Sequence, residues 1–483
     1  MTIRIYNTLS GTKEEFTPIE PGKVRMYVCG PTVYDYSHIG HARSVVVFDV
    51  IARYLRACGY EVTYVRNFTD VDDKIIRRAA ELDKDPRELA ATFIRAFHED
   101  MDALHVQRPD HEPKVTEHIA SIQRFVSRLV EKEAAYAVEG NVYFAVDRFP
   151  GYGKLSKRSL EEMEAGARVE VDTRKRNPFD FALWKAAKPE EPFWASPWGD
   201  GRPGWHIECS AMSGELLGET FDIHGGGKDL IFPHHENEIA QSEAAFEKPF
   251  ARYWVHNGFV NIDKEKMSKS LGNFLTVRDV LKTHHPETVR MFLLSSQYRS
   301  PLDFSAESME EATVRLQRLY GALLRVENGI GLPEAAPDHR EGSHWSAFSE
   351  AMNDDFNTAL ALGVLFDAVR ELNGLLDARE SGQEGAPAQK EEILGRTREL
   401  LYLGGSLLGL FQETPSAFFE RQQRLQASRH EVDPETVERL IAERAAARKA
   451  KDWAAADRIR DELEAMNVQL EDRPDGTVWK FRP

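Results

Sequence analysis

The chain has 483 residues, 42% of them hydrophobic, which is enough for about two to four domains with sizeable cores. Its formal net charge of −17 is not that of a general nucleic-acid binder, so an RNA partner would have to bind a local basic patch. There is no apolar run of about 18 residues and no apolar signal region at the N-terminus, which argues against a membrane span and predicts a cytoplasmic protein. Three cysteines are too few for a disulfide framework and predict reduced thiols.

The first part of the chain predicts a parallel sheet. Residues 1–23 form an N-terminal extension with one strand. Residues 24–28 have the β-type pattern Val-Arg-Met-Tyr-Val, residues 44–55 predict an apolar helix, and residues 60–66 predict a second strand. A strand–helix–strand unit with a crossover indicates parallel strands.

The rest of the chain predicts an insertion, a return to the sheet and a helical C-terminal half. After a helical stretch at 86–132, residues 139–205 are rich in Pro, Gly and Trp, which predicts an insertion with loops. The sheet then continues with a helix from 202, a strand and glycine turn at 221–230, a helix at 233–242 and a strand at 253–260. Beyond 303 we expect a helix to about 326, a linker, a helical bundle at 345–412, helices at 434–451 and 453–466, and a hairpin at 468–479.

The segment between the first strand and the first helix contains the tetrad His38-Ile-Gly-His41. At a helix start, two imidazoles three residues apart lie on one helical face. Free backbone N–H groups and the positive end of the helix dipole would add to them, and Gly40 lets a ligand approach the backbone. The tetrad therefore predicts an anion site, although an ordinary helix start with two polar histidines would have the same pattern.

A polar loop at 263–273 contains Lys266-Met-Ser-Lys269-Ser, whose ammonium groups can neutralise phosphate charge. Taken alone, such a loop is typical of a solvated surface. The histidine tetrad followed much later by this lysine loop resembles the two signature motifs of class I aminoacyl-tRNA synthetases.

Two further motifs argue against hydrolytic chemistry. The segment His224-Gly-Gly-Gly227 has the composition of a hydrolase oxyanion loop, but no Gly-x-Ser-x-Gly nucleophile elbow accompanies it. His235-Glu-Asn-Glu is not a zinc-protease motif, because Ile239 stands where the second histidine would be.

Four residues are candidate metal ligands: Cys29, Cys209, His234 and Glu238. His234 and Glu238 are four residues apart on one predicted helix and can share a metal, and both cysteines lie at edges of elements that could converge there. Buried cysteines and a surface ion pair explain the same residues, so spacing alone leaves both interpretations open. Cys58, near the end of an apolar helix, is predicted to be a core residue.

From end to end, the chain resembles the cysteinyl-tRNA synthetase family. The matching segments are 26–35, 38–41, 66–74, 204–210, 222–230, 233–238, 266–270, 353–359 and 451–460. The resemblance implies an α/β fold class, with a Rossmann-like parallel-sheet catalytic domain containing an insertion, followed by α-helical C-terminal domains. It implies a catalytic domain at 1–315 with its insertion at about 105–200, a helical bundle domain at 316–412, and a small tRNA anticodon-binding domain at 413–483.

The resemblance also implies an activity, which is ATP-dependent ligation of L-cysteine to tRNA(Cys) through a cysteinyl-adenylate, by a monomer, with Mg²⁺ accompanying ATP. His38, His41, Lys266 and Lys269 would be catalytic, and one Zn²⁺ on Cys29, Cys209, His234 and Glu238 would bind the substrate thiolate. Gly30, Thr69, Trp205, Gly227, Asp229 and Lys269 would contact the amino acid or ATP. Zinc prefers thiolate, whereas an apolar pocket rejects near-isosteric serine only about 100-fold, so the metal would supply the discrimination.

The C-terminal region predicts a tRNA surface, because positive charge and aromatic rings for base stacking concentrate there. The residues are Arg439, Arg444, Arg448, Lys449, Lys451, Trp453 and Trp479, with Glu438 and Glu443 interleaved as on an ordinary solvated helix. The alternative function is a related cysteine ligase of mycothiol synthesis, which acts on an amino-sugar and lacks such a region, so the residues beyond about 405 argue against it. A non-catalytic zinc RNA-binding paralogue would be expected to lack the tetrad or the lysines, and both are present.

Overall fold

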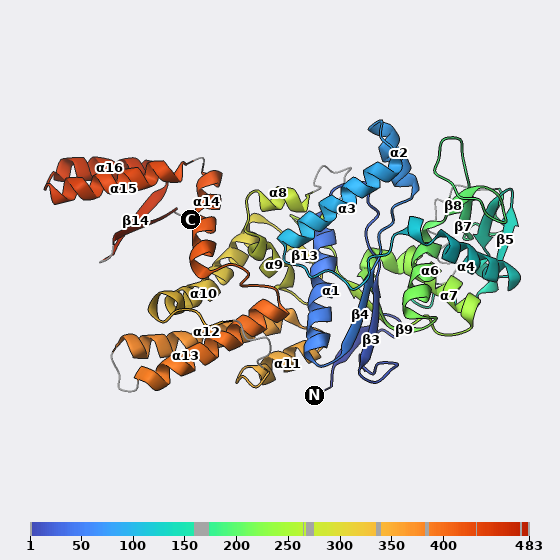
Figure 1. The fold of residues 1–483 in the computed structure, drawn as a ribbon, viewed down its shortest axis with the longest axis horizontal. Coiled ribbons are helices and arrows are strands. Elements are labelled where there is room, and N and C mark those ends of the chain that lie inside the picture. Colours follow the sequence, from blue (N-terminus) through green and yellow to red (C-terminus); the bar gives the residue numbers. More distant parts are fainter. Residues whose placement is uncertain are drawn as a thin grey trace.

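A parallel sheet lies at the centre of the molecule (Figure 1). The computed structural model describes residues 2–158, 173–263, 265–266, 275–334, 340–381, 386–430, 432–473 and 476–481. Within these residues the sheet has the order β10–β9–β3–β4 with every pair parallel, and its strands are β3 (Lys23–Val28), β4 (Glu61–Arg66), β9 (Phe221–Gly227) and β10 (Ala251–Asn257). Strands from the two halves of the catalytic region thus pair side by side, and the predicted parallel-sheet fold class is confirmed.

The connections that follow the two central strands, β3 and β9, run toward opposite edges of the sheet. Helix α1 (Ile39–Ala57) leads from β3 outward to β4, and helix α7 (Glu236–Phe246) leads from β9 outward to β10. In such a sheet the crevice between diverging connections lies at the carboxyl ends of the strands, which is the usual ligand site of the fold. Helix α1 is buried along nearly its whole length because its Val, Ile and Phe side chains face the sheet on one side and helical segments on the other.

The insertion contains more regular structure than predicted. The chain between β4 and β9 comprises α2 (Asp73–Glu81), α3 (Pro86–Ala103), η1 (Val115–Glu117), α4 (Ile119–Glu131), β5 (Ala135–Val138), β6 (Asn141–Phe144), η2 (Val146–Arg148), β7 (Phe181–Ala186), β8 (Gly201–Pro203) and α6 (Trp205–Leu217). Of these, the elements from η1 to β7 lie within the predicted insertion at about 105–200. Strands β5 to β8 pair in order as an antiparallel sheet. Their aromatic side chains join α4, α6 and α7 in one apolar core, which is why these short segments are strands rather than the predicted loops.

Smaller elements complete the catalytic region. They are β1 (Arg4–Asn7), β2 (Thr12–Glu15), η3 (Lys228–Leu230), η4 (Ile231–His235), β11 (Val260–Ile262), β12 (Glu265–Lys266), α8 (Val277–Leu281), α9 (Pro286–Leu294) and β13 (Leu302–Phe304). The N-terminal extension holds two paired strands where one was predicted. The glycines of residues 225–227 lie inside β9 rather than in the predicted turn.

The C-terminal half is helical, as predicted. It consists of α10 (Ala306–Gly329), α11 (Trp345–Asn353), α12 (Thr358–Glu380), α13 (Ala386–Leu400), η6 (Leu401–Leu407), α14 (Pro415–Arg429), α15 (Pro434–Lys449), α16 (Trp453–Ala465) and the hairpin β14 (Val468–Arg473) and β15 (Gly476–Phe481). Figure 1 shows α15, α16 and the hairpin at one end of the molecule and β5, β7 and β8 at the other. None of the helices in the described part of the chain combines the length and apolar character that crossing a membrane requires. The domain boundaries stay predictions.

Candidate active site

A cavity of about 450 Å³ opens at the carboxyl ends of β3 and β9, where the crevice of the sheet is expected. The predicted site residues that line it are Cys29, Gly30, His38, His41, Trp205, Gly227 and Asp229. They come from segments far apart in the sequence, and the fold brings Cys29 of the predicted metal ligands and the tetrad to one cavity.

The histidine tetrad forms the start of α1, as predicted. The Nδ1 atom of His38 accepts hydrogen bonds from the N–H groups of Gly40 (3.1 Å) and His41 (3.3 Å), so His38 is the cap of the helix. The two imidazoles stack with their ring centroids 3.6 Å apart. Both rings line the cavity beside the positive end of the helix dipole.

One part of the anion-site prediction is wrong. The first backbone N–H groups of α1 are not free, since those of Gly40 and His41 bond to His38 and that of Ile39 donates to the Leu275 carbonyl at 3.2 Å. The helix therefore offers an anion its imidazoles and dipole rather than open N–H groups.

The residues that follow the predicted lysine loop contact the start of α1. Residues 267–274, including Lys269, lie outside the described residues; Lys266 ends β12, and its side chain is likewise outside them. Directly after the loop, Leu275 accepts from Ile39, Thr276 forms a β-bridge with His38, and the Val277 N–H donates to the Ser37 carbonyl at 2.8 Å. Residues 275–277 are thereby tied to the start of α1.

The predicted metal ligands converge behind the cavity. The Sγ atom of Cys29 lies 3.5 Å from Sγ of Cys209 and 3.4 Å from a carboxylate oxygen of Glu238, and Nε2 of His234 lies 3.6 Å from Sγ of Cys209 and 3.0 Å from Glu238. Ligands at zinc distances from a tetrahedral centre lie about 3.3–3.8 Å apart. The donor set and its distances fit zinc. From the sequence alone, a metal site and buried cysteines beside an ion pair were both open.

The fold explains this convergence. Cys29 directly follows β3, Cys209 lies in α6, and Glu238 lies in the first turn of α7. The sequence predicted that His234 and Glu238 share one helix. In the structure His234 belongs instead to η4, the segment before α7, in which Phe232 departs from helical geometry. The pair still meets because His234 and Glu238 remain one turn apart.

The charges in the cluster favour a cation. Burial raises the pKa of Glu238, but the adjacent His224 and His234 outweigh it and hold that pKa well below its usual range, so the residue is a carboxylate. Burial also favours the neutral thiol of Cys209, yet a hydrogen bond from Cys29 and the proximity of His234 lower its pKa to about 6. Burial and the neighbouring acidic groups raise the pKa of Cys29 well above its usual range, a cost that a bound cation would relieve.

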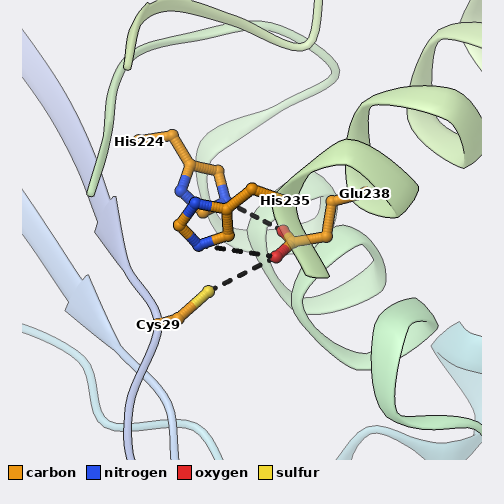
Figure 2. A group of neighbouring side chains, drawn as sticks. All are labelled: Cys29, His224, His235 and Glu238. Atoms are coloured by element: carbon orange, nitrogen blue, oxygen red, sulfur yellow. Dashed lines mark hydrogen bonds and ion pairs between the residues drawn. The ribbon is translucent and has the colours of Figure 1, made fainter. Parts of the chain in front are cut away.

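Sequence reasoning missed two histidines in the same cluster. Figure 2 shows His224 and His235 turned toward Glu238 and Cys29, with Nε2 of His224 2.8 Å from the second oxygen of Glu238. Cys29, His224, His235 and Glu238 form a second group with metal-binding spacing that overlaps the predicted one. His224 lies in the middle of β9, where the sequence pattern predicts only a strand residue ahead of the glycines.

Of the two groups, the predicted one suits zinc better, because it supplies two sulfur donors, which zinc prefers. His224 then orients the carboxylate from the far side, as partners of metal ligands commonly do. Nε2 of His235 is buried without a hydrogen-bond partner among the described residues and lies 3.9 Å from Glu238, which is consistent with a cation in the cluster.

Of the remaining predicted residues, Trp205 and Gly30 line the cavity, whereas Thr69 does not. Trp205 stacks on His234 with ring centroids 4.1 Å apart, and its ring lines the cavity beside the thiols. At Gly30 a side chain is excluded, because a Cβ atom would lie 1.6 Å from the Asn67 carbonyl oxygen. Thr69 is buried, and its hydroxyl donates to Glu208 at 2.7 Å, so it borders the site from behind rather than through a free hydroxyl.

The C-terminal basic patch is less open than predicted. Trp479 is only 4% exposed and its Nε1 donates to Glu438, so the prediction that it stacks on unpaired bases is wrong. Arg444 and Arg448 both bond to Asp472. Trp453, by contrast, is 60% exposed and remains a candidate for stacking.

Comparisons with known proteins agree with this geometry. Residues 15–314 match the family model of the class I (C) tRNA synthetase catalytic domain, residues 347–412 the DALR domain, and residues 433–479 the cysteinyl-tRNA ligase anticodon binding domain. A cysteine–tRNA ligase of Geobacter metallireducens is 56% identical over 490 residues, covering 100% of both chains. The chain belongs to the cysteine–tRNA ligase family.

Further relatives support the same membership. A cysteine–tRNA ligase of Halorhodospira halophila is 56% identical over 480 residues, covering 99% of both chains. Among solved structures, a Mycobacterium tuberculosis methionyl-tRNA synthetase in complex with methionyl-adenylate has a TM-score of 0.59 at 15% identity, covering 82% of this chain and 93% of that one. This second likeness supports the class I fold, and class I synthetases use ATP with Mg²⁺.

Proposed function

We propose that the protein ligates L-cysteine to tRNA(Cys) in two steps, through a cysteinyl-adenylate. The observation that carries the proposal is the joint position of two chemistries at one cavity: a thiol-rich donor cluster that reaches the cavity wall at Cys29, and a pair of stacked histidines at the start of α1. A ligase that must activate a carboxyl group and recognise a sulfur atom needs both within the length of one aminoacyl-adenylate.

The donor cluster accounts for the choice of cysteine over serine. Cys29, Cys209, His234 and Glu238 are proposed to hold one Zn²⁺, which when bound supplies a Lewis acid with a preference for sulfur over oxygen. The protein contributes the preset geometry, because all four side chains are fixed by burial or hydrogen bonds before any ligand enters. A ligand hydroxyl would fill nearly the same space as a thiol, so shape alone would discriminate poorly.

The tetrad end of the cavity accounts for adenylate formation. His38 and His41 are proposed to bind the phosphates of ATP at the positive end of the α1 dipole. Lys269 and Lys266 are proposed to stabilise the charge that develops on the α-phosphate and pyrophosphate as the cysteine carboxylate attacks. Mg²⁺ would accompany the leaving pyrophosphate, and no covalent enzyme intermediate is required.

The residues between the two ends position the substrate. Trp205 is proposed to cover the cysteine side chain next to the thiol cluster, and Gly30 leaves room for the backbone of the amino acid. Thr69 is proposed to support this pocket through Glu208. Gly227 and Asp229, at the end of β9, are proposed to contact the ribose of the nucleotide.

Transfer to tRNA involves the C-terminal helices. We propose that Trp453 and the exposed basic residues of α15 contact tRNA(Cys), although part of their charge is neutralised by Asp472. A cytoplasmic location and a monomeric state belong to the same proposal, and light scattering of the purified protein tests the second.

Cysteine-dependent exchange of pyrophosphate into ATP, followed by aminoacylation of tRNA(Cys), tests the proposal. We expect exchange with cysteine but not with serine, and transfer of cysteine to the tRNA. Exchange with cysteine but transfer only to an amino-sugar would instead support the mycothiol-type ligase. Absence of any cysteine-dependent exchange from folded, zinc-supplied protein would contradict the proposal.

A further inference from the structure

The turn between α11 and α12 contains a buried carboxylate that the proposed mechanism does not use. Asp355 is fully buried, and it and Phe356 both have positive φ, 64° and 50°. Such backbone is strained for residues other than glycine and persists where the surroundings over-determine it.

The carboxylate of Asp355 binds three consecutive residues of the catalytic region. Its Oδ1 accepts from the Tyr298 hydroxyl at 2.8 Å, and its Oδ2 accepts from Nε2 of Gln297 at 3.2 Å and from Nε of Arg299 at 2.7 Å. Oδ1 also accepts from the backbone N–H of Tyr6 at 2.9 Å. One carboxylate from the helical half of the chain therefore fixes the turn formed by residues 297–300.

That turn is held from its other side by α1. The buried guanidinium of Arg43, two residues beyond the tetrad, donates to the carbonyl oxygens of Tyr298 at 3.3 Å and Ser300 at 2.5 Å. It also donates to the carbonyl of Phe259 at 2.7 Å, which belongs to the wall of the cavity. The 297–300 turn is thus clamped between the signature helix and Asp355.

The turn directly supports one wall of the cavity, residues 257–260. The Gly258 N–H donates to the Tyr298 carbonyl at 2.8 Å, and a Cβ atom at Gly258 would lie 2.4 Å from the Ser300 carbonyl oxygen. Wall and turn are therefore in backbone contact, and a shift of the turn moves the wall. The wall continues from β10, in which Asn257 is paired with Gly227.

We propose that Asp355 is a positioning residue for the nucleotide half of the active site, holding the 257–260 wall through the 297–300 turn. The inference rests on the proposed function, because that function places the ribose at Gly227 and Asp229, next to this wall. Of the four thiol-cluster residues only Cys29 lines the cavity, whereas Cys209, His234 and Glu238 are not among its lining residues. Loss of the carboxylate should therefore weaken binding of ATP and leave binding of cysteine nearly unchanged.

The adjacent Asp354 provides a matched control. It belongs to the same segment, but its side chain is 49% exposed and makes an ion pair with Lys13 at 2.7 Å. Asp355→Asn keeps the size of the side chain and its tolerance of positive φ, while replacing one acceptor oxygen by an N–H₂ group that faces the donors of Gln297 and Arg299. Asp354→Asn makes the same chemical change where no such network exists.

Steady-state pyrophosphate exchange separates positioning from general stability. We expect Asp355→Asn to raise the KM for ATP about 10-fold, with the KM for cysteine within about twofold of wild type, and Asp354→Asn to change neither. An unchanged KM for ATP in folded Asp355→Asn, or an equal rise in both KM values, would overturn the proposal, because a merely structural role would not distinguish the two substrates.

Two further measurements keep the test decisive. If Asp355→Asn does not fold, Tyr298→Phe removes a single hydrogen bond to the carboxylate and should raise the KM for ATP about threefold; no change would overturn the proposal. If wild-type protein shows no cysteine-dependent exchange, the proposed function fails, and calorimetric titration with ATP then tests positioning by itself. Weaker ATP binding by Asp355→Asn than by Asp354→Asn would support positioning, and equal binding would contradict it.

Discussion

The thiol cluster and the basic surface of α15 both contain candidate binding side chains, but those of the cluster are buried and those of α15 lie at the surface. In the cluster, Cys209, His234 and Glu238 are buried, and His234 lies 3.6 Å from Cys209 and 3.0 Å from Glu238, so their charges and geometry are fixed in advance. On α15, Arg444 and Arg448 are bonded to Asp472 at the surface, where a partner can rearrange them. Burial fixes the cluster in advance, whereas an RNA that bound the α15 surface, as proposed, would have to compete with Asp472 for these arginines.

The first prediction removes one donor from the preformed site. Cys209→Ser should reduce cysteine-dependent exchange about 1,000-fold or more, since loss of a partner that merely orients a metal ligand costs about 10–100-fold and loss of a ligand costs more. The KM for ATP should stay near its wild-type value. Cys58→Ser is the matched control, because Cys58 lies at the end of α1 outside the cavity and should leave exchange unchanged. Equal activity of the two variants would contradict the assigned role.

The second prediction concerns Lys269 of the predicted lysine loop, whose role rests on the sequence motif. Lys269→Ala should slow adenylate formation about 100-fold or more, since removing one preorganised donor to transition-state charge costs about 100–1,000-fold. Affinity for cysteine, measured by equilibrium titration, should barely change. A wild-type rate of pyrophosphate exchange would exclude Lys269 from the reaction.

The third prediction concerns the C-terminal surface and compares an exposed tryptophan, Trp453, with a buried one, Trp479. Trp453→Ala should reduce aminoacylation of tRNA(Cys) about 10-fold without affecting pyrophosphate exchange, because stacking on one base contributes about 1–3 kcal/mol. Trp479→Ala should instead destabilise the C-terminal unit by about 3–5 kcal/mol, because it removes a buried side chain. Thermal melts followed by circular dichroism distinguish the two effects. A Trp453→Ala variant that charges tRNA normally would remove that residue from the interface.

The fourth and smallest effect follows from the arginine pairing. The hydrogen bonds from Arg444 and Arg448 hold the pKa of Asp472 below its usual range, so the two arginines stay paired at neutral pH. Asp472→Asn should release them and lower the KM for tRNA about threefold at low salt, with the gain fading as salt rises. Stability should change by less than about 1 kcal/mol, as for other exposed ion pairs. A higher KM for tRNA would indicate that Asp472 orders this surface rather than masking it.

The same contrast explains how far the sequence could be used. Local patterns predicted the strands of the parallel sheet and the helix that begins at the tetrad. The four donors were implied by the family resemblance, and the structure brings them together. His224 and His235 were missed because their role arises only when β9 and α7 meet at Glu238. Trp479 was misjudged because exposure cannot be read from a short hairpin whose side chains alternate between solvent and a small core. The capping of α1 by His38 was missed because a side chain competes with ligands for the same N–H groups.

The central claim is that the cavity selects cysteine by its sulfur atom, through a zinc ion held by Cys29, Cys209, His234 and Glu238. Zinc-edge X-ray absorption of the purified protein, recorded alone, with saturating cysteine and with serine, tests it most directly. The account predicts about one zinc per chain with two sulfur neighbours, a third sulfur neighbour in the presence of cysteine, and no change with serine. Protein without zinc, or a sulfur count that does not change when cysteine is added, would contradict it.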